Sequence, residues 1–138
     1  MKVSFKFDSE IGFTSDDSKK KIEFKNSIVN KDEYHSPTEL LLLAMGGCTS
    51  DDVLNILKKM REKVKSYRCE VTGEKRDTDP KMLKYAEIHY IFDGDVDSES
   101  VKKAIDLSLE KYCSVSLTVK GAGIPVSYYY TINGKDYR

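Results

Sequence analysis

Alternating apolar and polar residues near the start of the chain predict a half-buried β-strand at residues 2–7. Its apolar face consists of Val3, Phe5 and Phe7. The elements expected next are short strands at residues 11–14 and 22–24, a polar turn at 15–18 between them, and a polar loop at 26–35. The chain is therefore expected to begin with short strands.

A long helix is predicted to begin at Ser36 and to run to about Val64. Ser36 suits the N-cap, Pro37 suits the first helical position, and Glu39 completes a capping box with Ser36. The apolar run Leu40–Met45 would be buried on every side of the helix, whereas the part after Cys48 is amphipathic. A single small sheet cannot cover such a helix, so we expect a second protomer to cover it.

The rest of the chain alternates between strand and helix patterns. The expected elements are strands at 67–73, 86–93 and 126–132, a turn at 77–80, a helix from Asp97 or Ser98 to about Cys113, and a loop at 121–125. Residues 114–119 fit a helix or a strand, because their period is two but they follow a helix directly. This order predicts an α+β fold in which residues 1–138 form a single domain.

Composition narrows the classes of function. The 138 residues contain 23 Lys and Arg and 23 Asp and Glu, so the net charge is zero and gives no reason to expect nucleic acid or an anionic membrane as a partner. The charged, alternating start does not resemble a secretory signal, and the apolar runs are too short for a membrane span. We therefore expect a cytoplasmic protein whose cysteines are not held in a structural disulfide.

Two of the cysteines stand out as candidates for chemistry. Cys48 follows Gly46 and Gly47 inside the predicted helix, where each glycine costs about 1 kcal/mol relative to alanine. Cys113 lies at the boundary of an element, where a thiol is more accessible. Cys69 is interpreted as a small core residue of a strand. The pattern alone leaves open whether Cys48 and Cys113 form a functional pair or are merely buried.

Other signatures of function are weak. His35 and His89 stand alone, and the cysteines lack metal-ligand spacing, so no metal is expected. The sequence contains neither a GxGxxG motif nor a P-loop, so we expect no nucleotide or other cofactor.

Two long motifs resemble the OsmC/Ohr family of osmotically inducible and organic-hydroperoxide-resistance proteins, and in particular its YhfA-like branch. These motifs are Ser36–Leu40 followed by Gly46-Gly47-Cys48, and Lys111–Val115 around Cys113. The resemblance implies an OsmC-like fold, with antiparallel sheets and a long central helix, in an intertwined homodimer. It also implies that Cys48 attacks a hydroperoxide, that Cys113 resolves the product, and that an external dithiol reduces the resulting disulfide.

The groups that activate the thiol in the peroxide reductases differ here. The family places an arginine in the N-terminal strands and a glutamate directly after the proline at the helix start. The first arginine of this chain is Arg61, and Thr38 follows Pro37, with Glu39 one place later. Thr38 and Glu39 are the candidate supporting residues, and a smaller thiolate fraction with slow turnover is expected. The alternatives are a redox-sensing or small-molecule-binding dimer without efficient turnover, and a structural dimer with inert cysteines.

Overall fold

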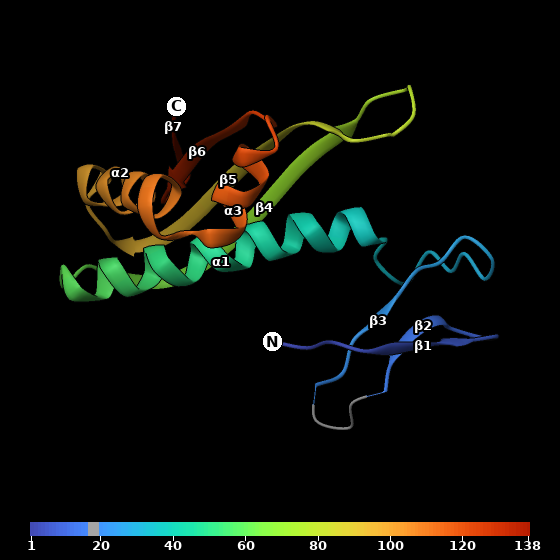
Figure 1. Cartoon of the computed structure of the whole chain (residues 1–138). Coiled ribbons are helices and arrows are strands. Elements are labelled where there is room, and N and C mark those ends of the chain that lie inside the picture. The colour runs from blue at the N-terminus through green and yellow to red at the C-terminus, as the bar shows by residue number, and fades with distance from the viewer. Residues whose placement is uncertain (17–19) are drawn as a thin grey trace. The chain divides into compact units, whose positions relative to one another are not determined.

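The computed structural model describes residues 1–16 and 20–138, and it divides into two compact units, Met1–Leu41 and Leu42–Arg138 (Figure 1). It confirms the α+β class, with a long helix and largely antiparallel sheets. The turn expected at residues 15–18 falls partly outside the described residues.

The first unit is built on three antiparallel strands within the described residues. They are β1 (Phe5–Asp8), β2 (Gly12–Ser15) and β3 (Glu23–Phe24), paired in that order. The rings of Phe5, Phe13 and Phe24 lie edge-on or tilted, with centroids 5.0 to 5.1 Å apart. Phe5 and Phe7 nevertheless remain 52% and 51% exposed. The expected half-burial of this apolar face is therefore incomplete within one protomer, and Val3 lies before the strand.

Helix α1 (Pro37–Lys59) begins as predicted and ends earlier than predicted. The Glu39 amide donates to Ser36 Oγ at 3.3 Å, and the Ser36 amide donates to Glu39 Oε1 at 2.9 Å, which confirms the capping box. The helix ends because Arg61 adopts a left-handed conformation with φ of 63°. The amides of Arg61 and Glu62 then reach the carbonyls of Lys58 and Leu57, as in a Schellman motif.

The second unit contains a mixed sheet in the order β4-β5-β6-β7. Its strands are β4 (Lys63–Lys75), β5 (Leu83–Asp95), β6 (Val126–Ile132) and β7 (Lys135–Tyr137). The pairs β4–β5 and β6–β7 are antiparallel, whereas β5 and β6 run parallel. A parallel pair requires a crossover, which is made by α2 (Ser98–Leu107), a π-helical turn (Ser108–Tyr112) and α3 (Ser114–Gly121).

The core of the second unit lies between one face of this sheet and its helices. Ile88, Tyr90 and Phe92 are fully buried on alternate positions of β5. They form one cluster with buried residues of α1 and α2, among them Val53, Leu57, Val101, Ala104 and Ile105. Helix α1 has the length and apolar composition of a membrane span. Because its inner face is buried against this sheet, it is a core helix of the fold.

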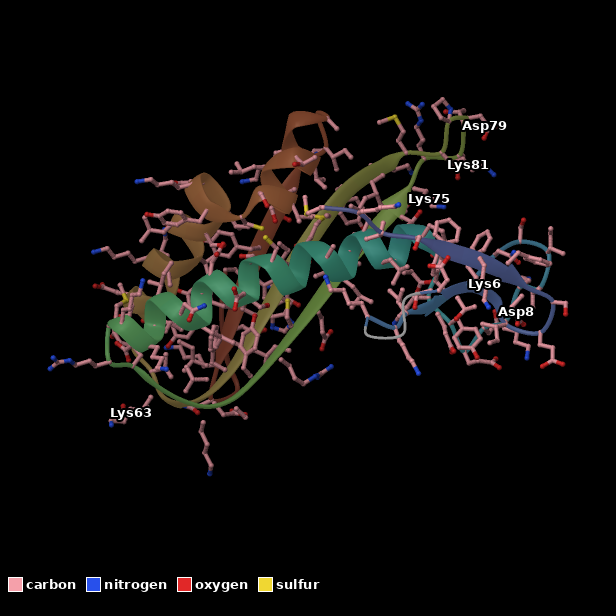
Figure 2. The ribbon with its side chains drawn as sticks, turned by 60° about the horizontal axis from the view of Figure 1, so that its bottom comes forward. Lys6, Asp8, Lys63, Lys75, Asp79 and Lys81 are labelled. Atoms are coloured by element: carbon pink, nitrogen blue, oxygen red, sulfur yellow. The ribbon has the colours of Figure 1, made fainter. Side chains whose placement is uncertain are left out.

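Charged side chains mark both ends of the β4–β5 hairpin (Figure 2). Lys75, Asp79 and Lys81 lie at its turn, and Lys63 lies at the opposite end, where β4 begins. Lysines on a strand at the edge of a sheet oppose pairing with another strand, because they must stay solvated. These lysines therefore oppose strand pairing at the two ends of the β4 edge of this sheet.

Several predicted elements need correction. Val64 belongs to β4 rather than to the helix, because the left-handed conformation of Arg61 ends α1 before it. This end could not be predicted from the sequence, since no glycine stands there. Residues 114–119, for which the sequence left helix and strand open, form a helix with Cys113 as the N-cap of α3. Strand β7 was not anticipated, although Asn133 and Gly134 before it adopt the positive φ values of a tight hairpin.

The glycines before Cys48 provide a test of helix packing. A Cβ at Gly46 would lie 2.8 Å from Val71 Cγ2, whereas one at Gly47 would meet no described atom within 4 Å. We expect Gly46→Ala to lower the free energy of unfolding by about 1–2 kcal/mol, because the β-branched Val71 cannot easily move. Gly47→Ala should raise that free energy by about 1 kcal/mol through helix propensity.

Urea unfolding of the two variants beside the wild type would measure both changes. A Gly47→Ala variant that loses stability would contradict the expectation that helix propensity decides the effect at this position.

Candidate thiol site

Cys48 lies in the interior of α1, directly after the glycine pair. Its side chain is partly buried, so part of the residue is open to solvent in the protomer. The helix continues past it to Lys59, so Cys48 is at neither helix end and receives no help from unpaired terminal amides. Cys48 therefore combines access with a rigid backbone.

Cys113 lies in a different setting. It is fully buried and lies between the π-helical turn and α3, where its side chain fills the N-cap position. The thiol donates to Ser116 Oγ at 3.0 Å, and the Ser116 amide donates to Cys113 Sγ at 3.4 Å. Ser116 is also fully buried, so these bonds are shielded from water. The Cys113 sulfur thus takes the capping role that an oxygen of Ser, Thr, Asp or Asn usually has.

The fold brings the two thiols together. Burial raises the pKa of the Cys113 thiol, the hydrogen bonds between Cys113 and Ser116 lower it, and the neighbouring Cys48 thiol raises it further. The neighbourhood of Cys48 and Cys113 that the sequence left open is therefore present in the structure.

A buried chain of hydroxyl groups connects the elements that carry the two thiols. Thr49 Oγ1 lies 2.8 Å from Tyr90 Oη and 2.8 Å from Ser108 Oγ, and Ser108 donates to Asp52 Oδ2 at 2.9 Å. Because Asp52 only accepts, the protons are ordered from Tyr90 through Thr49 and Ser108 to that carboxylate. The backbone carbonyl of Ser108 in turn accepts the Cys113 amide at 2.7 Å. Thr49, the residue next to Cys48, is thus linked through Ser108 to Cys113.

Cys69 lies on β4 and packs against the core, in agreement with its interpretation as a small core residue. A Cβ at Gly46 would lie 3.3 Å from its Sγ, so the strand and α1 are in close contact here. Burial raises the pKa of the Cys69 thiol, although hydrogen bonding to Ser50 and Tyr67 opposes this. Cys69 is therefore a poor nucleophile at neutral pH.

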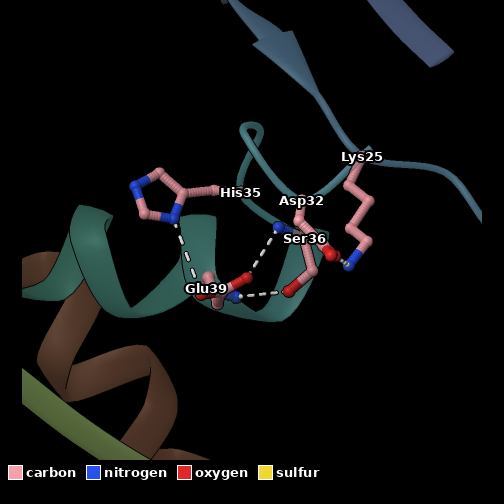
Figure 3. A network of polar contacts seen from close by, with 5 residues as sticks. All are labelled: Lys25, Asp32, His35, Ser36 and Glu39. Atoms are coloured by element: carbon pink, nitrogen blue, oxygen red, sulfur yellow. Dashed lines mark hydrogen bonds and ion pairs between the residues drawn. The ribbon is translucent and has the colours of Figure 1, made fainter. Parts of the chain in front are cut away.

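The two supporting residues proposed from the sequence lie at the start of α1. Figure 3 shows the Glu39 carboxylate bonded to the Ser36 amide and lying 3.6 Å from His35 Nδ1. The bond to the Ser36 backbone holds the pKa of Glu39 below its usual value, with His35 contributing. Thr38 is half-buried beside it. Glu39 thus takes part in the helix cap. Separately, Lys25 and Asp32 form an ion pair at 2.8 Å in the segment before the helix.

Sequence reasoning missed the hydroxyl groups around the thiols. Ser116, Thr49 and Ser108 carry the hydrogen bonds that hold Cys113 and α1 in place. The Cys-Ser-Val-Ser order was a usable signal, since a capping side chain bonds the amide three residues later. Within residues 1–16 and 20–138, no group of three or more His, Cys, Asp and Glu side chains could hold a metal ion.

Comparison with known proteins identifies the family. The family model described as OsmC-like protein matches residues 30–128, a range that includes both thiols. Protein YhfA of Escherichia coli K12 is 40% identical over 99 residues, covering 70% of this chain and 74% of that protein. The chain belongs to the OsmC-like family.

Solved structures of this OsmC-like fold agree with that assignment. A hypothetical protein from Aquifex aeolicus VF5 is 34% identical, with a TM-score of 0.79 and 96% of both chains covered. An organic hydroperoxide resistance protein OsmC from Legionella pneumophila has a TM-score of 0.65 over 96% of both chains. At 12% identity, this second likeness concerns the fold alone.

The hydroxyl chain predicts a specific loss of stability in this OsmC-like protein. Thr49→Val keeps the shape of the side chain but leaves the Tyr90 hydroxyl and Ser108 Oγ short of a buried partner. We expect the free energy of unfolding to fall by about 1–3 kcal/mol. Thr118→Val is the matched control, since that exposed hydroxyl bonds only the Ser114 carbonyl among the described residues. It should change stability by less than about 0.5 kcal/mol. Equal losses in the two variants, measured by urea unfolding, would contradict a role for the buried chain.

Proposed function

We propose that this protein is a homodimeric, thiol-dependent hydroperoxide reductase, in which Cys48 attacks the peroxide and Cys113 resolves the product. The observation that carries the proposal is the neighbourhood of the two thiols, one partly exposed and one buried at a helix N-cap. Membership of the OsmC-like family supports it, as does the shared fold with a protein named for organic hydroperoxide resistance.

The proposed reaction proceeds in two steps. The Cys48 thiolate attacks one peroxide oxygen, the O–O bond breaks, and the alkoxide takes up a proton and leaves as an alcohol. The sulfenic acid formed on Cys48 then condenses with the Cys113 thiol, so that an S–S bond forms and water leaves. An external dithiol reduces the disulfide and is itself oxidised to a disulfide.

Turnover is expected to be slow and to increase with pH. The Glu39 carboxylate is engaged by the Ser36 amide, which supports the view that it serves the helix cap. Burial raises the pKa of Cys113, so its thiolate becomes populated only as the pH rises above neutral. The rate of disulfide closure should therefore increase from neutral towards alkaline pH.

The second candidate is a redox-sensing OsmC-like dimer whose thiols oxidise without efficient turnover. The raised pKa of the buried Cys113 favours it, because a resolving thiol that is mostly protonated at neutral pH closes the disulfide slowly. Under either function, the reducing cytoplasm is the proposed location, since it would return the pair to its free thiols.

The dimer is proposed from apolar surface that one protomer leaves uncovered. The sequence pattern predicted burial of Leu40–Met45 on every side of α1. In the structure, Leu43 is 53% exposed and Leu41 is 39% exposed. Phe5 and Phe7 are about half exposed as well. Apolar surface of this extent favours association with a second copy. We propose that the two compact units complete a single OsmC-like domain within this dimer.

Oxidation by cumene hydroperoxide tests the function directly. One equivalent should join Cys48 to Cys113 and leave Cys69 free, as read by peptide mapping after alkylation. With excess peroxide and either dithiothreitol or reduced lipoamide, stopped-flow and coupled assays should give slow turnover that rises with pH. Cys48→Ser should abolish turnover, whereas Cys69→Ser, the matched control, should retain it.

The possible results separate the candidates. Disulfide formation without multiple turnover would favour the sensing function over the reductase. Cys69 in the dominant disulfide, or thiols that stay reduced in the folded protein, would overturn both. A fast reaction independent of pH from mildly acidic conditions upward would contradict the expected slow chemistry.

The dimer predicts a concentration-dependent effect of a surface charge. Leu43→Glu should shift the protein from dimer towards monomer at micromolar concentration, because burying an unpaired carboxylate at an interface costs several kcal/mol. The control is Lys58→Glu, an exposed position on the same helix, which should leave the dimer intact. Light scattering and sedimentation would measure both, and a wild-type protein that remains a folded monomer would refute the proposed dimer.

A further inference from the structure

The two thiols of the proposed pair are chemically unequal, and the difference lies in Ser116. Cys113 receives the Ser116 amide at 3.4 Å and lies within 3.0 Å of the Ser116 hydroxyl oxygen. It also occupies the N-terminus of α3, which runs from Ser114 to Gly121. Cys48 lies in the middle of α1, far from either end of its helix.

These contacts favour negative charge on the Cys113 sulfur. In the reduced protein, the thiol donates its proton to Ser116 Oγ. When the sulfur loses that proton, the Ser116 hydroxyl can rotate and donate in the opposite direction, because a hydroxyl is both donor and acceptor. The amide and the helix dipole already point at the sulfur. A thiolate on Cys113 would thus find two donors in place.

The two sulfurs also differ in their access to solvent, and here Cys48 has the advantage. Cys113 is fully buried, whereas Cys48 is partly exposed. In thiol–disulfide exchange the incoming thiolate must reach one sulfur along the S–S axis, and the other sulfur leaves. The exposed sulfur is the one that can be attacked, and the buried sulfur is the one with the donors that a leaving group needs.

We infer that Ser116 is the residue that stabilises the leaving thiolate of Cys113 when an external dithiol reduces the Cys48–Cys113 disulfide. This inference rests on the proposed function, because it requires that disulfide. The dithiol thiolate attacks Cys48 Sγ, a new S–S bond forms there, the Cys48–Cys113 bond breaks, and its electron pair passes to Cys113 Sγ. Ser116 donates its N–H and O–H to that charge.

The second thiol of the same dithiol completes the step. It loses its proton, attacks the dithiol sulfur bound to Cys48, and releases the Cys48 thiolate as the dithiol closes into a cyclic disulfide. The protein has then gained two electrons and the dithiol has lost two. A monothiol such as glutathione cannot close a ring, so its mixed disulfide is removed only by Cys113 or by a second glutathione, and rapid acid quenching stops both reactions.

The test begins from a disulfide made without peroxide. Diamide oxidises the full-length wild type, Ser116→Ala, Ser116→Thr and Ser114→Ala, each also carrying Cys69→Ser, and peptide mapping verifies the Cys48–Cys113 bond. Dithiothreitol in excess then reduces each protein in a stopped-flow experiment. Ser114→Ala is the matched control, because Ser114 is an exposed serine in the first turn of the same helix.

The expected result is a slower reduction in one variant. Losing the hydroxyl donor should raise the pKa of Cys113, and because a less stabilised thiolate leaves more slowly, reduction should slow by about three- to tenfold. Ser116→Thr, which keeps a hydroxyl, should recover most of the rate, and Ser114→Ala should match the wild type. The thiolate absorbance of Cys113 in a Cys48→Ser background should titrate at higher pH after Ser116→Ala.

A separate measurement on the wild type covers the case in which Ser116→Ala folds poorly. Brief treatment of the oxidised protein with glutathione, followed by acid quenching and mapping, should find the adduct on Cys48. An adduct mainly on Cys113, or equal reduction rates for Ser116→Ala and the wild type, would overturn this inference and leave the thiol pair standing. If diamide forms no Cys48–Cys113 bond, the proposed function fails and this inference fails with it.

Discussion

A buried hydrogen bond between Thr49 and Ser108 joins the helix that carries Cys48 to the turn that precedes Cys113. Thr49 follows Cys48 on α1, and the carbonyl of Ser108 holds the amide of Cys113 at 2.7 Å. Ser108 therefore contacts the residue next to Cys48 through its side chain and Cys113 through its backbone. Because the bond is fully buried, it is stronger than it would be in water, and breaking it would leave polar atoms unpaired. The π-helical turn places Ser108 where it can make both contacts.

The elements that could be predicted are those in which local chemistry and hydrophobic pattern agree. The capping box of Ser36 and Glu39, the Asp97 cap and the alternating strand β5 all required only nearby residues. The end of α1 was missed because Arg61 takes a left-handed conformation that usually belongs to glycine. The parallel pairing of β5 with β6 was beyond sequence reasoning, since it depends on where a whole crossover packs.

The sequence pointed to the two cysteines that lie near each other, but not to the groups around them. Cys48 and Cys113 were singled out by two motifs, and the structure places them near each other. The surrounding hydroxyl groups could not be predicted, because Ser and Thr are common and the strength of their hydrogen bonds depends on burial that the sequence does not reveal. Serine is usually exposed at the protein surface, yet Ser116 is fully buried and hydrogen-bonded to the Cys113 sulfur. Glu39, a candidate supporting residue of the thiol, has its carboxylate hydrogen-bonded to the Ser36 amide in the helix cap.

The crossover between β5 and β6 determines when Cys48 and Cys113 come near each other as the chain folds. Cys48 lies before the β4–β5 hairpin, and Cys113 is carried by the segment that returns the chain to the parallel strand β6. Contacts between residues so distant in sequence form late, because the intervening loop must close first. The proximity of Cys48 and Cys113 is thus a property of the finished fold.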